Sequence, residues 1–186
     1  MSDILLPQVA FSGSQLTGTA IKKTTRTIGD LKSIFKNNEA YNKLSSVKIV
    51  YEVHSYLPVP ENTTGGLFFG ITFIHPGNVG DEYFMTKGHF HKIEDRAEFY
   101  WGIEGEGMLI LMDKNRNTWA EKMYPGNLHY INGCTAHRTA NTGNSMLSFG
   151  ACWPSDAGHD YDTISKQGFS KILVKRNGHP ELVNRR

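Results

Sequence analysis

The sequence is poor in the features that mark several common classes of protein. It has two cysteines in 186 residues, Cys134 and Cys152, and because their spacing matches no zinc or redox motif, we expect both to be reduced structural residues. No apolar stretch reaches the ~18 residues that a membrane span requires. The chain begins without a basic segment followed by a long apolar one, so no leader is evident, and we expect a cytoplasmic protein without a membrane partner.

An excess of charge of one sign is also lacking. The formal net charge of +2 is too small to indicate binding to nucleic acid. Hydrophobic residues make up 39% and charged residues 20% of the chain, which is ordinary for one globular domain with one core. Aromatic residues are plentiful, with eight Tyr, ten Phe and three Trp, and they favour strands and the walls of pockets.

The first fifty residues differ from the rest. The tetrapeptide Thr-Ile-Gly-Asp at 27–30 resembles a capping box with Asp in its last position. Leu31, Ile34 and Phe35 follow at helical spacing, which predicts a helix over residues 28–44. The preceding segment, rich in Ser, Thr and Gly, is expected to be an extended arm. We therefore expect an N-terminal arm and helix, residues 1–46, packed on a β-domain of residues 47–186.

Beyond residue 46 the pattern is that of short strands separated by turns of Pro, Gly and Asn. Strands are predicted over residues 47–52, 67–74, 83–91, 97–103, 108–112, 119–123, 128–131, 137–140 and 146–152. Short strands at this spacing are typical of an all-β sandwich or barrel. The tail from Asn177 is polar and is expected to lie on the surface, so that the whole chain forms one structural domain.

Two histidines two positions apart form the most informative pattern in the chain. In His89-Phe90-His91, a strand would turn both imidazoles to the same side, which suits chelation of a divalent ion. Glu98 begins the next apolar strand, and a hairpin would return it beside the two histidines. His137 follows a Pro-Gly turn and could complete the set from a later strand. The pattern predicts a metal site of three imidazoles and one carboxylate.

The type of ligand narrows the choice of metal. Mixed nitrogen and oxygen ligands suit iron(II), manganese(II), nickel or zinc better than calcium, and iron(II) is our first expectation. A six-coordinate ion would keep two positions open for water or substrate, which is typical of a catalytic site. The alternative is that the two histidines are incidental, as such pairs in strands more often are, but the longer motifs around them favour the metal.

These motifs resemble those of the cupin superfamily, whose fold is a double-stranded β-helix or jelly-roll barrel. The first motif is matched by His89, His91, Glu98 and Gly105, and the second by residues 126–137 and Asn141. Two departures are visible. The gap between His91 and Glu98 is longer than in the general pattern, and Asn132 and Cys134 stand where the second motif usually has Pro and Gly.

The longer gap is shared with the cupin-type glucose-6-phosphate isomerases of archaea and some bacteria, which this chain resembles over residues 28–178. The matching segments are 87–91, 95–98, 136–139, 156–161 and 168–171. The last two are absent from general cupins. The resemblance implies a homodimer with one divalent ion per subunit that interconverts glucose 6-phosphate and fructose 6-phosphate, a step of glycolysis and gluconeogenesis.

The resemblance also implies roles for individual residues. The metal ligands would be His89, His91, Glu98 and His137. The residues contacting the sugar phosphate would be Thr72, Thr86, Lys87, Gly88, Tyr100, Trp153, His159 and Tyr161. Trp153 stands where the family often has Tyr, and it keeps a ring and a donor N–H but loses a hydroxyl.

Side-chain alternation adds expectations about charge. Lys87 shares the strand face of the two histidines, so Thr86 should face away from the site unless the chain kinks at Gly88. Lys87, Arg96 and Arg138 could supply positive charge around an anionic substrate. Four other histidines lack such neighbours and are assigned structural or surface roles: His54, His75, His129 and His179.

Two chemical routes remain open for the isomerisation. In one, Glu98 is the base that shuttles a proton through a cis-enediol, with His159 or Tyr161 assisting. In the other, hydride moves directly between the carbons and Glu98 is only a ligand. Two further readings of the site are a cupin dioxygenase, which also uses three His and one Glu, and a non-catalytic sugar-binding cupin.

Overall fold

The computed structural model describes residues 3–185 of the chain. The strands are β1 (Val9–Ser12), β2 (Gln15–Gly18), β3 (Ile21–Thr27), β4 (Ile49–Tyr56), β5 (Leu67–Ile74), β6 (Asn78–Val79), β7 (Glu82–Tyr83), β8 (Glu98–Glu104), β9 (Gly107–Met112), β10 (Thr118–Met123), β11 (Leu128–Ile131), β12 (Ala136–Asn141), β13 (Leu147–Pro154), β14 (Lys171–Arg176) and β15 (His179–Asn184). The helices are a 3-10 helix, η1 (Ile28–Leu31), and two α-helices, α1 (Asn38–Asn42) and α2 (Tyr161–Gln167). The all-β prediction is confirmed.

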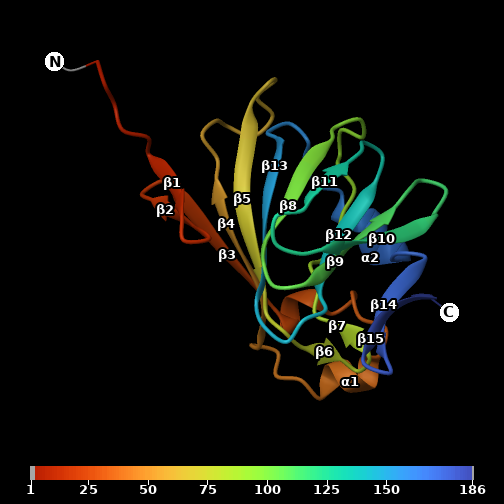
Figure 1. Ribbon diagram of the computed structural model, residues 1–186. Helices are drawn as coiled ribbons and strands as arrows, with labels where there is room; N and C mark the ends of the chain where they lie inside the picture. Colours follow the sequence, from red (N-terminus) through yellow and green to blue (C-terminus); the bar gives the residue numbers. More distant parts are fainter. Residues whose placement is uncertain (1–2, 186) are drawn as a thin grey trace.

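Two sheets face each other and form the body of the molecule (Figure 1). One has six strands in the order β11-β8-β13-β5-β4-β3, and the other has three in the order β10-β9-β12. A four-stranded sheet, β15-β14-β7-β6, closes one end. Apolar side chains between the sheets, such as Leu109 of β9 and Phe149 of β13, are buried in one continuous core. Burial of this shared core is what holds the sheets together.

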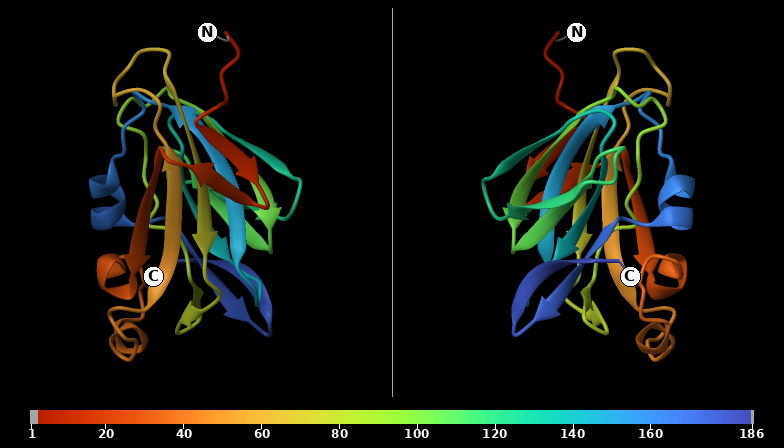
Figure 2. Two further views of the ribbon diagram at one scale, coloured as in Figure 1. Left: turned by 90° about the vertical axis from the view of Figure 1, so that its left-hand side faces the viewer. Right: turned by 90° about the vertical axis from the view of Figure 1, so that its right-hand side faces the viewer.

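The arm before the helices is extended, as predicted. Strand β3 pairs antiparallel with β4 along the edge of the six-stranded sheet. The hairpin β1–β2 lies across one face of that sheet (Figure 2), and its turn is tied down where the Ser14 hydroxyl donates to Glu104 Oε1 at 2.7 Å. Leu16 on this hairpin is buried. The arm therefore contributes a strand to the main sheet.

The single helix predicted over residues 28–44 is wrong. The chain forms η1, then turns, and begins again as α1, which is capped by Asn37 through its side-chain oxygen and the Ala40 N–H at 2.9 Å. Ile28 and Gly29, whose N–H groups have no acceptor within the helix, donate to carbonyls of residues 48 and 46. The capping box itself is present, with the Thr27 N–H donating to Asp30 at 2.8 Å.

One predicted strand is also wrong. The strand predicted over residues 83–91 ends at Tyr83, and beyond it only isolated bridges occur, such as Met85 with Ala140 and His89 with His137. The polar tail lies at the surface, as predicted, and its strand β15 pairs with β14 over its whole length. The remaining predicted strands match observed ones within two residues at each end, except that β4 continues to Tyr56, four residues beyond its predicted end. Within residues 3–185, no helix combines the length and apolar character needed to cross a membrane.

Candidate metal centre and substrate cavity

Four side chains that are distant in sequence meet between the two sheets. His89 and His91 come from the irregular segment after β7, Glu98 is the first residue of β8, and His137 is the second residue of β12. One ligand atom from each lies within 4.8 Å of all the others. The bridge between His89 and His137, with backbone N–H donors in both directions, aligns the two sides. The group has the composition and spacing to hold one metal ion.

The hydrogen bonds of the site leave one atom of each residue free. His91 Nδ1 lies 2.7 Å from the carbonyl of Arg96, and His137 Nδ1 lies 3.2 Å from the carbonyl of Thr135. Each Nδ1 can therefore donate to a carbonyl, which turns a lone pair on Nε2 inward. The atoms of this cluster that have no hydrogen-bond partner outside it are His89 Nε2, His91 Nε2, Glu98 Oε1 and His137 Nε2. Glu98 Oε1 lies 2.5 Å from His137 Nε2 and 3.3 Å from His91 Nε2. Orphaned buried polar atoms are costly, and a cation between them would satisfy all four.

The electrostatics of the cluster match those of a ligand set. Burial alone would raise the pKa of Glu98, but His137 and His91 beside it lower that pKa to about 2. Burial, together with the neighbouring imidazoles, moves the pKa of His89 well below its usual value. Burial would lower the pKa of His91, but Glu98 raises it overall. An ionised carboxylate and neutral imidazoles are the states that bind metal, so binding would release any proton shared by His91 and Glu98.

A cavity of about 480 Å³ opens beside this cluster. Its wall includes every residue expected to contact the sugar phosphate: Thr72, Thr86, Lys87, Gly88, Tyr100, Trp153, His159 and Tyr161. Gly88 has a φ of 76°, and this kink in the chain lets Thr86 and Lys87 reach the same cavity. The structure thus gathers residues from β5, β8, β13 and two loops around one space.

Aromatic rings line the side of the cavity nearest His89. The His159 ring lies edge-on to His89 with a centroid distance of 4.4 Å, and it stacks on Tyr161 at 5.5 Å with an interplanar angle of 10°. Lys87 Nζ lies 4.8 Å from the centre of the Tyr161 ring. Burial lowers the pKa of His159 and raises the pKa of Tyr161. Both groups are therefore favoured in their neutral forms.

One cation of the cavity was missed in the sequence. Arg26 lies on its wall together with Thr24, both from β3. In the sequence, Arg26 stands in a basic, polar arm with nothing to link it to the histidines. The pairing of β3 with β4, in which Arg26 opposes Tyr51, carries it to the cavity. The only local signal is that Thr24 and Arg26 share one face of a strand.

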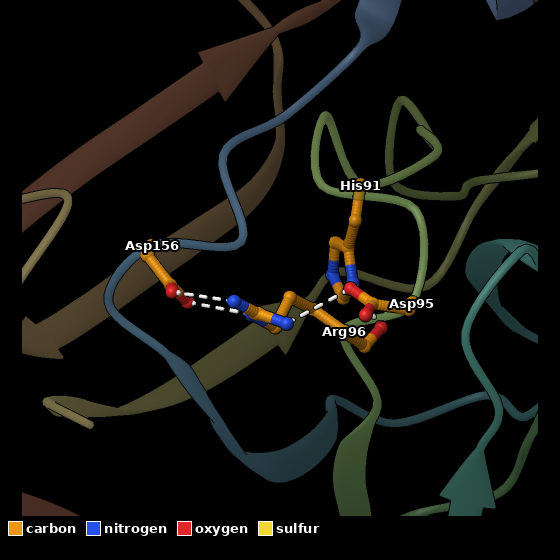
Figure 3. Close-up of polar contacts among 4 residues, drawn as sticks. All are labelled: His91, Asp95, Arg96 and Asp156. Atoms are coloured by element: carbon orange, nitrogen blue, oxygen red, sulfur yellow. Dashed lines mark hydrogen bonds and ion pairs between the residues drawn. The ribbon is translucent and has the colours of Figure 1, made fainter. Parts of the chain in front are cut away.

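Arg96, which could have supplied charge near the substrate, does not line the cavity. It lies instead among Asp95, Asp156 and the candidate ligand His91 (Figure 3). Its guanidinium forms two bonds with the carboxylate of Asp156, Nε to Oδ1 at 3.0 Å and Nη2 to Oδ2 at 2.9 Å, and a third with Asp95 at 2.9 Å. Its carbonyl is the partner of His91 Nδ1. Arg96 thus connects a candidate metal ligand to the start of the loop that carries His159.

Arg138 was expected at the same place and is also absent from the wall of the cavity. It is 4% exposed, its Cζ lies 4.2 Å from the centre of the Phe169 ring, and its Nη2 donates to the Lys87 carbonyl at 3.1 Å. Burial and the nearby Arg185 lower the pKa of Arg138 to about 9. The side chain is therefore still charged at neutral pH.

A second cavity, of about 420 Å³, lies between α2 and the turn after β9. Several of its charged groups are engaged with one another or with the backbone: Lys114 pairs with Glu94, and Arg116 donates to Gln167 and Gly168. His91 lines this second cavity, whereas the other three ligands, His89, Glu98 and His137, line the first. The first cavity is therefore the candidate functional site.

The fold and this site define a class, that of small all-β proteins built from facing sheets, with one group of three His and one Glu able to bind a metal. The chain belongs to the glucose-6-phosphate isomerase family, whose model matches residues 25–185. The curated relative from Thermococcus kodakarensis, named glucose-6-phosphate isomerase, is 44% identical over 88% of this chain and 86% of its own length. The relative of that name from Pyrococcus horikoshii is 40% identical over 95% of this chain and 93% of its own length.

Among solved structures, an oxalate decarboxylase from Bacillus subtilis overlaps with part of the chain. It has a TM-score of 0.45 and 16% identity, and the overlap covers 59% of this chain and 26% of that one. This partial overlap says nothing about function.

Proposed function

We propose that the protein interconverts glucose 6-phosphate and fructose 6-phosphate, with one divalent ion bound by His89, His91, Glu98 and His137. The observation that carries the proposal is the convergence of four orphaned ligand atoms beside a cavity with cationic side chains on its wall. Membership of the isomerase family, and relatives of that name over nearly the full length of the chain, support the same reaction. The reaction would take place in the cytoplasm, within glycolysis and gluconeogenesis.

The substrate fits the character of the cavity. Lys87 and Arg26 supply positive charge for a phosphate, and hydroxyls of Thr72 and Thr86 can donate to its oxygens. Tyr100 and Trp153 offer aromatic surface to the sugar. In place of the Tyr frequent in the family, the indole N–H of Trp153 can donate but cannot accept a hydrogen bond.

The residues divide the chemistry between them. When bound, a divalent ion acts as a Lewis acid on the oxygens of C1 and C2. The Glu98 carboxylate, ionised at neutral pH, accepts the proton from C2 and returns it to C1 through a cis-enediol. His159 and Tyr161 exchange protons with the substrate oxygens. A direct hydride shift, with Glu98 only as ligand, is the second route.

Solvent isotope incorporation separates the two routes. Conversion of fructose 6-phosphate in heavy water should place deuterium in the product if the enediol forms, because the proton on Glu98 can exchange with solvent. Complete absence of deuterium would favour the hydride shift. Analysis of the product by mass spectrometry at low conversion gives the answer.

For the metal we propose iron(II), with manganese(II), nickel and zinc as the other candidates, because imidazole and carboxylate ligands accept all four. The test is a coupled assay with fructose 6-phosphate after chelation and after addition of each ion. Restored turnover supports the proposal, and activity untouched by strong chelators contradicts it. Oxygen uptake with a diketone or thiol would instead support the alternative of a cupin dioxygenase, and sugar-phosphate binding without turnover that of a non-catalytic binder.

We also propose a homodimer that forms through the outer face of the six-stranded sheet. Phe99 and Tyr130 face each other there across β8 and β11, with ring centroids 5.1 Å apart, and are 44% and 54% exposed. Neighbouring Leu128 is 66% exposed. Clustered exposed apolar side chains are typical of subunit interfaces. Light scattering should give twice the chain mass, and Tyr130→Glu should shift it to the monomer.

A further inference from the structure

Arg138 is a buried cation that lacks an ion pair. None of the ion pairs among residues 3–185 includes Arg138, Glu82 acts on its charge only from beyond ion-pair distance, and Arg138 Nε has no hydrogen-bond partner. Its donors go instead to the Met85 sulfur at 3.2 Å and to the Lys87 carbonyl at 3.1 Å. A buried charge without a partner is expensive, and an apolar side chain of similar volume would ordinarily serve the core better. The charge therefore calls for a reason other than stability.

The bond from Arg138 to the Lys87 carbonyl sets the direction of one peptide group. The peptide between Lys87 and Gly88 is trans, so its N–H points opposite to its carbonyl. Since the carbonyl points to Arg138, the N–H of Gly88 points away from it. That N–H has no hydrogen-bond partner among the described residues.

Gly88 presents only backbone to the cavity, and Arg138 is the reason. A Cβ on Gly88 would lie 2.9 Å from Arg138 Nε, and the φ of 76° disfavours any other residue. The side of Gly88 that a side chain would occupy is thus filled by the guanidinium. The opposite side lines the cavity that Lys87 also lines.

We propose that Arg138 is a positioning residue for anion recognition. It holds the 87–88 peptide so that the Gly88 N–H faces the cavity as a donor to the substrate phosphate, and its unpaired charge strengthens the attraction behind that N–H. Backbone N–H groups that are free and backed by positive charge are ready-made anion donors. The phosphate as ligand rests on the proposed function, whereas the direction of the peptide rests on the geometry alone.

The test uses Arg138→Met, which keeps the volume and the contact with Phe169 but loses both charge and donors. The matched control is Arg176→Met, since Arg176 is exposed on β14 and far in sequence from the site. On the metal-loaded protein we expect the affinity for inorganic phosphate, measured by calorimetry, to fall about tenfold, and the KM for fructose 6-phosphate to rise by about the same factor. kcat should stay within about threefold, metal content should not change, and the melting temperature should not fall.

Arg138→Lys keeps the charge and can still donate to the Lys87 carbonyl. Its phosphate affinity and its KM should lie between those of wild type and Arg138→Met.

Should Arg138→Met fail to fold, a measurement on the zinc-loaded wild-type protein provides the test. Its Gly88 amide resonance should move on addition of phosphate, and a resonance that stays in place overturns the proposal. Unchanged KM and phosphate affinity in Arg138→Met, or loss of metal from it, would also overturn the proposal. If the wild-type protein binds phosphate but does not convert fructose 6-phosphate, the proposed isomerase activity is refuted. The comparison of phosphate affinities between wild type and Arg138→Met still tests the role of Arg138 in that case.

Discussion

Two buried histidines on neighbouring parts of the barrel differ in a single respect. His129 of β11 is 4% exposed and His137 of β12 is 1% exposed. The ring of His129 uses both nitrogens, Nδ1 with Glu121 Oε2 at 2.6 Å and Nε2 with Asn127 Nδ2 at 2.7 Å. His137 uses Nδ1 with a backbone carbonyl, whereas its Nε2 has no partner outside the cluster and lies 2.5 Å from the candidate ligand Glu98 Oε1.

The difference teaches that neither burial nor residue type identifies a functional histidine. What separates the two is whether the surrounding protein satisfies every polar atom of the ring. A ring whose two nitrogens are both hydrogen-bonded stabilises the fold. A ring with a free nitrogen that points at other free ligand atoms can bind a metal ion. Substitutions at the two positions should therefore have opposite consequences for metal and stability.

The largest effect is expected from His137→Ala. Loss of a residue that only supports a ligand typically lowers metal affinity about 10- to 100-fold. His137→Ala removes one of the four ligands themselves, so the affinity should fall further. Turnover of fructose 6-phosphate should be lost with the metal. Elemental analysis after gel filtration measures the bound metal, and the coupled assay measures turnover. A folded variant that keeps one metal per chain would show that the ligand set is wrong.

The contrasting substitution is His129→Ala, which should reduce stability and spare the metal. It leaves the Glu121 carboxylate and the Asn127 amide without their buried partner, which costs about 2 kcal/mol in the free energy of unfolding. Denaturant titration measures this cost, and metal content per folded chain should equal that of wild type. Should His129→Ala lose its metal while remaining folded, the distinction between the two histidines would fail.

A smaller effect is expected where the metal cluster meets its support. Asp156→Asn removes the charge that holds the Arg96 guanidinium, and so loosens both the carbonyl opposite His91 and the loop to His159 (Figure 3). kcat/KM should fall about threefold to tenfold, with the metal retained. The double variant Arg96→Ala/Asp156→Ala should lose no more than the worse of the two single alanine variants, because the residues act through one interaction. Additive losses would mean that they act independently.

The smallest effect is on stability in acid. The hydrogen bonds from Arg96 hold the pKa of Asp156 below its ordinary 3.8, although desolvation opposes this. A carboxyl whose folded pKa is lowered adds stability above its unfolded pKa and loses it as the pH falls through the folded value. Between pH 5 and about pH 2, chelator-treated wild type should therefore lose more stability than Asp156→Asn. Denaturant titrations at the two pH values measure the free energy of unfolding of each protein. An equal loss of this free energy in wild type and in Asp156→Asn would contradict the prediction.

Strand pattern and candidate ligands could be predicted from the sequence because both are local. Short apolar runs between turns mark β5, β8 and β13 regardless of what they pack against. The spacing of His89 and His91 likewise needs only a short stretch of chain. The predicted helix over residues 28–44 failed for the complementary reason: its apolar residues are indeed buried, but their spacing does not show where the chain turns between η1 and α1.

The roles of the arginines were decided by tertiary structure. Arg26, Arg96 and Arg138 are alike as basic residues in a sequence, yet one lines the cavity, one pairs with Asp156 and one is buried behind Gly88. The sequence by itself determined the ligand types and the two strands that bear Glu98 and His137. Only the pairing of distant strands decided which charges face the substrate, because the direction of a side chain depends on the sheet that its strand joins and not on its neighbours in the chain.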